Sequence, residues 1–415
     1  MRTSARWALL LVLAGTMLLD SIEVSMMVVA LPSAGRSLDL TVTQAQALVT
    51  GFALGFGALV PFGGRAVSRF GRRRVYLGAL LLFAVASVLG AVSASFPLIV
   101  ATRVVKGCCA ALTAPAGLTI IATAFPAGRE RDRAISVYTT VAATGFTGGL
   151  LLAGALATTD WRWTLIAPAP AALLLFLLGL AVLPDLAEPP PARLGPGTPP
   201  GLLRAMAGAA TLNGSYLGLL LLATVWLQTR AGWPPLRTAL AFLPVSVPLA
   251  LGAPFSGRVV SKFGTRWPIM AGAVTVCLGY LLFGQVLRPG PVDPSDVLPP
   301  LLLVGVGFAL SFTALNVQAA TAVPVGQRAA ATGRYQTAVQ LAAVVVPLAV
   351  AVLLSWSAEG ALWLVTALGV LGVAVAVRGQ PRPDGAAEPV VPTPNRTDHR
   401  SWSDDFHHRS GPSGR

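Results

Sequence analysis

The chain has 415 residues, of which 54% are hydrophobic and only 11% are charged. A soluble domain carries roughly 25% charged residues, because polar groups must cover its surface. The formal net charge of +14 would suggest a nucleic-acid partner in a soluble protein. Repeated apolar stretches of about 20 residues, the length that crosses a bilayer, exclude that class and predict an all-α membrane protein with no nucleic-acid partner.

Taken in chain order, the hydropathy pattern predicts twelve transmembrane helices. The basic start, Met1–Arg6, resembles a signal peptide, but the apolar run continues past Leu31, so we interpret it as an uncleaved first helix. The predicted helices span 7–31, 45–64, 75–95, 97–121, 134–158, 164–183, 203–228, 236–259, 267–288, 297–323, 329–355 and 359–378.

A Pro- and Gly-rich segment between the sixth and seventh helices divides the chain. We expect an N-terminal six-helix bundle at 1–183, a cytoplasmic linker at 184–202, a C-terminal six-helix bundle at 203–378 and a disordered cytoplasmic tail at 379–415. The three histidines lie in this tail and the three cysteines lie in apolar stretches. No metal site is therefore expected.

The distribution of basic residues predicts the orientation of the helices. With the N-terminus in the cytoplasm, the cytoplasmic segments before the tail hold 17 Lys and Arg residues, and the external loops hold 5. Short loops rich in Lys and Arg stay on the cytoplasmic side. We therefore expect an inner (plasma) membrane protein with both termini in the cytoplasm.

One ten-residue segment occurs twice. Gly64–Arg73 follows the second predicted helix, Gly257–Arg266 follows the eighth, and seven of the ten positions are identical. Parallel repeats of this kind are typical of transporters built from two equivalent halves. We interpret the segment as a conformational gate, and the alternative is that its basic residues only set topology. The gate residues are Gly64, Ser68, Arg69, Gly71, Arg72, Arg73, Gly257, Ser261 and Gly264.

Over about residues 8–375 the chain resembles the major facilitator superfamily, in particular its drug:proton antiporter branch. The loop after the second helix is similar to the signature Gly-x-x-x-Asp-Arg-x-Gly-Arg-Arg. The first helix resembles the acidic stretch that ends in Ala-Leu-Pro, and the fourth and fifth resemble an Arg-x-x-x-Gly motif and a glycine-rich antiporter motif. The matching residues in these three helices are Asp20, Glu23 and Pro32, then Arg103 and Gly107, then Gly145, Gly149 and Gly154.

The resemblance implies a two-bundle transporter that exports molecules in exchange for protons, with a proton gradient in place of a cofactor. In the family the signature Asp is thought to latch the two halves. Ser68 stands at that position and Ser261 repeats the substitution, so we expect a weaker latch. The glycines of the fifth helix imply a bend that restricts leak, and plain close packing is the alternative.

Four charged residues lie deep in predicted helices: Asp20, Glu23, Arg103 and Lys106. Each charge at the bilayer centre costs about 2.5–3.5 kcal/mol on insertion scales, so chance placement is disfavoured. A moving cation changes the proton affinity of a buried carboxylate. We interpret the four as a proton-coupling or substrate-recognition cluster, with Glu23 the favoured proton carrier because it lies nine residues before Pro32, as in the motif. The alternative is a static salt-bridge cluster.

Polar residues inside the second-half helices are few and neutral, and we expect them to line a substrate cavity. The candidates are Asn213, Tyr216, Asn316, Gln318 and Gln340. A mostly apolar cavity with scattered hydrogen-bonding groups suits a small amphiphilic or hydrophobic organic molecule. The alternative for each residue is a hydrogen bond to a neighbouring helix.

We therefore expect a monomeric secondary transporter that exports drugs or metabolites by proton antiport. The sequence has no phosphate-binding loop and no catalytic constellation, so an ATP-driven pump or an enzyme is not expected. A proton-coupled or facilitative uptake transporter is the alternative within the same class. A membrane enzyme or a non-transporting sensor is less well supported, since no folded soluble domain is predicted.

Overall fold

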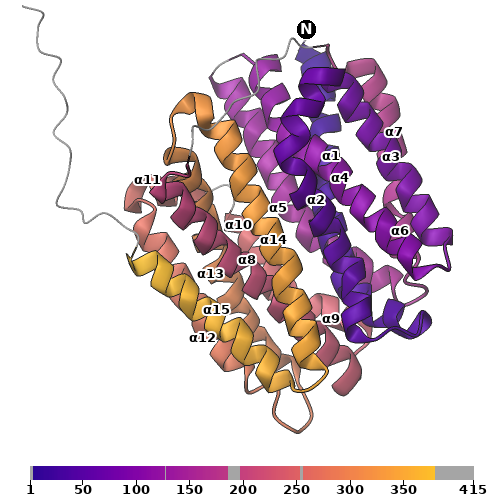
Figure 1. Ribbon diagram of the computed structural model, residues 1–415, viewed down its shortest axis with the longest axis vertical. Coiled ribbons are helices and arrows are strands. Elements are labelled where there is room, and N and C mark those ends of the chain that lie inside the picture. The colour runs from indigo at the N-terminus through magenta and orange to yellow at the C-terminus, as the bar shows by residue number, and fades with distance from the viewer. Residues whose placement is uncertain (1–2, 127, 186–196, 253–255, 379–415) are drawn as a thin grey trace, which may run out of the picture. The chain divides into compact units, whose positions relative to one another are not determined.

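The computed structural model describes residues 3–126, 128–185, 197–252 and 256–378, and these residues form helices and turns without a strand (Figure 1). The first half contains α1 (Thr3–Ser37), α2 (Val42–Phe70), α3 (Arg72–Val92), α4 (Phe96–Ala124), α5 (Arg129–Leu156), α6 (Trp163–Ile166) and α7 (Pro168–Val182). The second half contains α8 (Pro200–Val225), η1 (Trp226–Arg230), α9 (Pro235–Ala241), α10 (Leu243–Gly252), α11 (Ser256–Phe263), α12 (Arg266–Phe283), α13 (Pro294–Thr321), η3 (Val325–Gln327), α14 (Arg328–Leu354) and α15 (Ala358–Arg378).

Among the described residues, eleven helices are long and apolar enough to cross a membrane, or twelve if the bent pair α9 and α10 forms one span. The prediction of an all-α membrane protein with twelve spans is confirmed in this form. The expected continuous helix at 236–259 is instead bent by 45° between α9 and α10, and its last residues lie in α11. Pro244 supplies the reason, because a proline lacks the N–H for the helical bond and its ring clashes with the carbonyl four residues earlier.

The two halves repeat the same helix pairing. In the first half α1 packs against α5, α2 against α4, and α3 against both α4 and α7. In the second half α8 packs against α14, α10 against α13, and α12 against both α13 and α15. The sequence repeat after the second and eighth spans is therefore part of a repeat in structure.

Contacts between the halves also come in corresponding pairs. α2 of the first half packs against α14, and α5 packs against α9 and α10.

The predicted bundle limits at 183 and 203 lie close to the end of α7 and the start of α8. Most of the predicted linker, and the predicted tail from 379 onward, lie outside the described residues.

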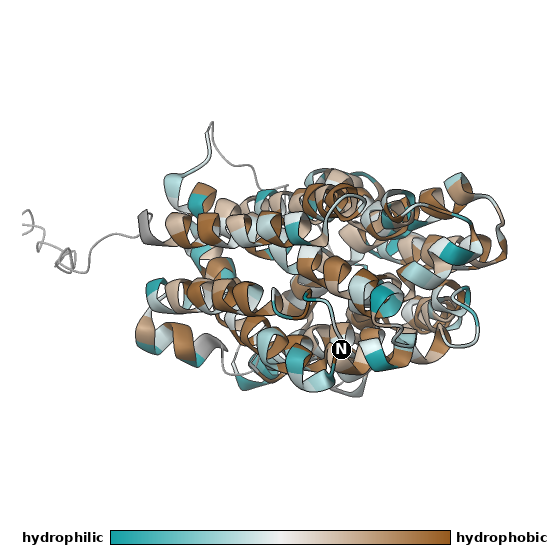
Figure 2. Cartoon of the chain, turned by 90° about the horizontal axis from the view of Figure 1, so that it is seen from below, coloured by the Kyte–Doolittle hydropathy of each residue, from teal (hydrophilic) through white to brown (hydrophobic). Residues whose placement is uncertain are grey.

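Large apolar side chains are exposed on many helices, among them α3, α7, α12 and α15. Leu82, Leu177, Leu281 and Leu371 each leave about half of their surface uncovered. Figure 2 shows hydrophobic residues on helices throughout the bundle, at its periphery as well as inside it. In water this much exposed apolar surface would be costly, whereas lipid tails cover it without cost. The exposed faces of these helices are therefore suited to contact with lipid.

Candidate functional site

A buried ion-pair triad joins α1 to α4. The Glu23 carboxylate pairs with the Arg103 guanidinium through Oε1 and lies 2.7 Å from Lys106 Nζ through Oε2. Each of the three side chains exposes only about 1% of its surface. The sequence analysis placed these residues at similar depth on two helices, and the structure brings them into contact.

Arg103 also ties α4 to α2. Its Nε donates a hydrogen bond to the Leu48 carbonyl at 2.7 Å, and its Nη2 donates to the backbone carbonyl of Glu23 at 3.3 Å. The guanidinium lies 5.5 Å from the centre of the Phe52 ring, and Lys106 Nζ lies 4.8 Å from that of Phe83. These contacts offset part of the cost of removing two cations from water.

Two glycines explain how α4 comes close enough to α2 for these bonds. A Cβ added to Gly107 would lie 2.9 Å from backbone atoms of Phe52 and Phe56. A Cβ added to Gly55 would lie 2.8 Å from the carbonyl carbon of Val104. No side chain fits at either position without moving backbone. Gly107, which matched the Arg-x-x-x-Gly motif, therefore sets the helix spacing that lets Arg103 reach α2.

Asp20 lies apart from the triad, although the sequence analysis grouped all four charges together. No ion pair among the described residues joins Asp20 to Arg103 or Lys106. Instead its Oδ2 accepts a hydrogen bond from Thr113 Oγ1 at 3.0 Å. Asp20 precedes Glu23 by nearly one helical turn, about 4.5 Å along α1, and therefore meets a different level of α4.

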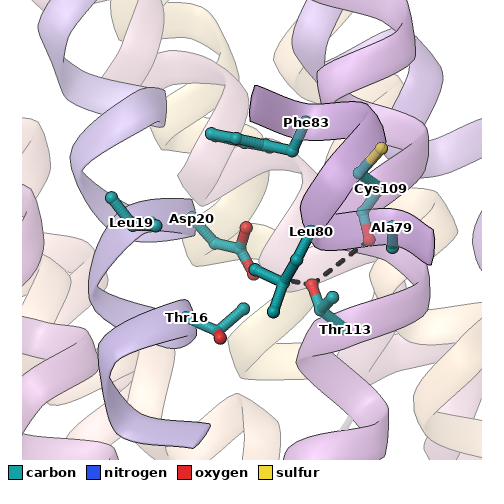
Figure 3. Close-up of a pocket in the computed structure, with 8 residues that line it drawn as sticks. All are labelled: Thr16, Leu19, Asp20, Ala79, Leu80, Phe83, Cys109 and Thr113. Atoms are coloured by element: carbon teal, nitrogen blue, oxygen red, sulfur yellow. Dashed lines mark hydrogen bonds between the residues drawn. The ribbon is translucent and has the colours of Figure 1, made fainter. Parts of the chain in front are cut away.

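A small cavity adjoins the Asp20 carboxylate, between α1, α3 and α4. Figure 3 shows the carboxylate and the Thr113 hydroxyl pointing toward each other, with the Leu80 and Phe83 side chains close by. The residues that line the cavity are Thr16, Leu19, Asp20, Ala79, Leu80, Phe83, Cys109 and Thr113. The space is about that of one water molecule.

The glycines of the fifth predicted helix serve two different contacts. Cβ atoms added to Gly145 and Gly149 would lie 2.7 Å from Ser21 and Ile22 of α1, respectively. A Cβ added to Gly154 would lie 2.6 Å from Ala239 of α9, in the other half. Gly145 and Gly149 therefore allow close packing within the first half, and Gly154 allows it between halves.

The repeated segment has the same local structure in both halves. Ser68 Oγ donates to the Arg65 carbonyl and Ser261 Oγ donates to the Arg258 carbonyl, both at 3.0 Å. In both segments a glycine with positive φ directly follows the helix, with φ of 82° at Gly71 after α2 and 67° at Gly264 after α11. Each serine thus bonds within its own helix, so it does not cap the helix that follows.

Other gate residues contact their own half. Arg73 Nη2 donates to the Leu180 carbonyl at 2.6 Å, and Nη1 lies 3.8 Å from the Asp185 carboxylate. Arg69 lies over the Phe70 ring at 5.6 Å, and Arg72 is buried. Gly64 lies within α2 and Gly257 within α11. The contacts of Arg73 fix the loop to the C-terminal end of α7.

The polar residues predicted for a substrate cavity have mixed surroundings. Asn213 Nδ2 donates to the Val339 carbonyl of α14 at 3.3 Å, and Asn316 Nδ2 donates to the Phe312 carbonyl of its own helix at 2.8 Å. Gln340 packs against Gly57 where α14 meets α2, and Gln318 is half-buried on α13. Asn213 and Asn316 thus serve helix contacts in this state.

Tyr216 belongs to a row of aromatic rings that crosses between the halves. Its ring centre lies 6.2 Å from that of Phe146 on α5 and 4.2 Å from that of Phe308 on α13. Phe308 in turn lies 5.0 Å from Phe312. Phe146 comes from the first half and the other three rings from the second.

Sequence reasoning missed Thr113 and the three phenylalanines. Thr113 follows Lys106 by seven residues, or two helical turns, so the face of α4 that carries both bases was a usable signal. The spacing of Phe308 and Phe312, four residues apart on one helix face, was a weaker one, because such pairs usually serve packing. Nothing in the sequence pointed to Phe146 as their partner.

Comparison with known proteins now identifies the architecture. The family model for the Major Facilitator Superfamily matches residues 13–316 and, in a second match, 245–410. The chain belongs to the Major Facilitator Superfamily. As a member of this superfamily it is a multi-pass membrane transporter.

Relatives within the superfamily include proteins named for drug resistance. A puromycin resistance protein of Streptomyces alboniger is 30% identical over 383 residues, which cover 77% of this chain and 76% of that protein. The multidrug resistance protein Stp of Mycobacterium tuberculosis is 28% identical over 367 residues, which cover 74% of this chain and 68% of that protein.

The fold also matches a solved transporter. A bacterial homolog of the human lysosomal transporter Spinster, in an inward-facing and unoccupied conformation, superimposes with a TM-score of 0.73. The match covers 92% of this chain and all of that chain, at 16% sequence identity. At this identity the likeness concerns the fold alone.

Proposed function

We propose that this transporter exports small amphiphilic or hydrophobic organic molecules from the cell in exchange for protons. The observation that carries the proposal is the set of buried carboxylates on α1, Asp20 and Glu23, in a chain whose relatives are named for drug resistance. Carboxylates inside a membrane protein are costly and mark ion pathways and proton relays. No other acidic side chain is buried among the described residues.

Alternating access requires the two halves to move against each other around a central site. Small residues line the contacts between the halves: Gly57 at the α2–α14 contact and Gly154 at the α5–α9 contact. Close backbone packing of this kind involves few interlocking side chains. The two related contacts therefore support a rocking movement of one bundle against the other.

The aromatic row supports a substrate with apolar, ring-containing chemistry. Phe146 and Tyr216 lie on opposite halves, so a molecule bound between them would touch both. Aromatic side chains favour offset stacking with other rings. The amides of Asn213, Asn316, Gln318 and Gln340 lie on the same set of helices, α8, α13 and α14, and would orient polar groups of the substrate.

Accumulation assays in an efflux-deficient bacterial host test this proposal. We expect cells that express the protein to accumulate less puromycin or ethidium than cells with an empty vector. A protonophore should abolish the difference, because it removes the driving gradient. Equal accumulation of a panel of aromatic cations and antibiotics in both strains would argue against export, and export that persists with the protonophore would argue against proton exchange.

The proposed orientation, with both termini cytoplasmic, has a separate test. Asp185 and Asp293 are exposed and fall on opposite sides of the membrane in the predicted topology. In a cysteine-free background, a membrane-impermeant maleimide applied to intact cells should label Asp293→Cys and not Asp185→Cys. Labelling of Asp185→Cys from outside would overturn this orientation.

A further inference from the structure

Two buried carboxylates, three residues apart on α1, have opposite electrostatic surroundings. Glu23 lies between two cations, Arg103 and Lys106. Asp20 is also buried, with 6% of its surface exposed, but its hydrogen-bond partner is the neutral Thr113 hydroxyl. Paired cations favour an ionised carboxylate, and burial without a cation favours the protonated form. The two acids are therefore suited to different roles.

The groups that face Asp20 from the packed helices are neutral near pH 7. The titratable ones are Tyr76 on α3, Cys109 on α4 and Tyr138 on α5, which lie near enough to interact electrostatically with the carboxylate. Phenols and thiols ordinarily ionise only above about pH 8. The remaining neighbours in Figure 3 are hydroxyl or apolar side chains. No described neighbour neutralises a charge on Asp20.

The Thr113 hydroxyl can bond to Asp20 in either protonation state. It lies 3.0 Å from Asp20 Oδ2, 3.2 Å from the Cys109 carbonyl and 3.3 Å from the Ala110 carbonyl. A hydroxyl has one donor proton and two acceptor lone pairs. With Asp20 ionised, Thr113 donates to the carboxylate. With Asp20 protonated, the Asp20 O–H donates to Thr113, which turns its own proton to a carbonyl of α4.

A water molecule in the adjoining cavity could accept the proton from Asp20. It has room for about one water molecule beside the carboxylate. On release, the O–H bond of protonated Asp20 breaks, the electron pair stays on the carboxylate, and the proton passes to water. Binding is the reverse of this step.

We propose that Asp20, rather than Glu23, binds and releases the exchanged proton, with Thr113 as the positioning residue that bonds to both protonation states. Glu23 then stays ionised between Arg103 and Lys106 and holds α1 to α4. The inference rests on the proposed proton exchange, and it departs from the motif position that the sequence analysis favoured.

Infrared difference spectroscopy of the purified full-length protein tests the site without a known substrate, since the titrant is the proton. We expect a protonated-carboxyl C=O band that disappears as the pH is raised. Asp20→Asn should remove this band. The charge-matched double variant Glu23→Gln/Lys106→Gln, which loses one charge of each sign, should keep it. A band that survives in Asp20→Asn and vanishes in the double variant would overturn the proposal, as would the absence of any titrating band.

Two substitutions of Thr113 test the proposal even if the Asp20→Asn protein does not fold. Thr113→Val removes the donor to the ionised carboxylate, so the midpoint of the band should move up by about one pH unit. Thr113→Ser keeps the hydroxyl and should leave the midpoint close to that of the wild type. An unchanged midpoint in Thr113→Val would contradict the positioning role.

This result is independent of the transport assay. If Asp20 titrates as described but the protonophore has no effect on efflux, the proton site is supported and the proposed proton antiport is contradicted. If efflux depends on the gradient but Asp20→Asn leaves the carboxyl band unchanged, antiport stands and the assignment to Asp20 fails.

Discussion

The two halves share one helix arrangement but differ in what they bury. Within the described residues, the first half buries the charged side chains Asp20, Glu23, Arg72, Arg103 and Lys106. The polar side chains that the second half buries are all neutral: Ser215, Thr224, Gln228, Thr238, Ser246, Ser311 and Thr366. Close helix crossings at glycine occur in both, at Gly107 in the first half and at Gly307 in the second.

The two halves therefore share their helix spacing but differ in the chemistry of their buried side chains. Charge in the first half suits ion coupling, because its energy changes strongly when neighbours move. Neutral hydrogen-bonding and aromatic groups in the second half suit binding of an apolar molecule.

The largest effect should follow from Glu23→Gln. The substitution leaves Arg103 and Lys106 buried without their anion, and breaking a buried ion pair costs roughly 3–5 kcal/mol. We expect a clear loss of thermal stability in detergent, measured by the unfolding of the purified protein. Glu23→Gln/Lys106→Gln should recover part of it, since one cation is removed with the anion. A single variant as stable as the wild type would show that the triad does not hold α1 to α4.

A smaller loss should follow from Gly149→Ala, at the α5–α1 contact. The added Cβ would lie within 2.8 Å of Ile22 backbone atoms, and overpacking of this kind costs about 1–3 kcal/mol. Gly148→Ala is the matched control, because no atom lies within 4 Å of its added Cβ. In thermal unfolding, the Gly149→Ala protein should unfold at a lower temperature than the Gly148→Ala protein. Equal stability in both variants would contradict the close approach of α5 to α1.

In the second half, Tyr280→Phe tests a neutral buried bond. Tyr280 Oη donates to Ser215 Oγ at 2.9 Å, with both residues fully buried. Hydrogen bonds between membrane helices are worth about 0.6 kcal/mol on average. We expect a small loss of stability and an unchanged pH dependence of efflux. A loss as large as that of Glu23→Gln would erase the energetic contrast between the halves.

The smallest effect on stability should come from Ser68→Asp, because Ser68 is exposed. The new carboxylate restores the residue type of the family signature, so we expect slower turnover with normal expression. Initial rates of efflux, compared at equal protein levels, measure this. Ser261→Asp makes the corresponding change in the second half. Unchanged kinetics in both variants would mean that the repeated segment is not a latch.

Much of the fold could be predicted from the sequence, because hydropathy and charge bias act over whole helices. The breaks at Pro168 and Pro244 could not be placed from hydropathy, since apolar residues continue across them. The contact of Glu23 with Arg103 and Lys106 could be predicted, because unpaired charges in a bilayer must find partners. The separation of Asp20 could not, since it depends on the level at which α4 packs against α1, where Asp20 meets Thr113 instead of Arg103 or Lys106.

The most direct test of the central claim is substrate-induced proton movement in everted membrane vesicles. Respiration acidifies such vesicles, and a pH-sensitive dye reports proton release when an exported compound from the accumulation screen is added. We predict that the wild type and Tyr280→Phe give this response and that Asp20→Asn gives none, at equal protein levels. A full response from Asp20→Asn vesicles would contradict the assignment of proton exchange to the first half through Asp20.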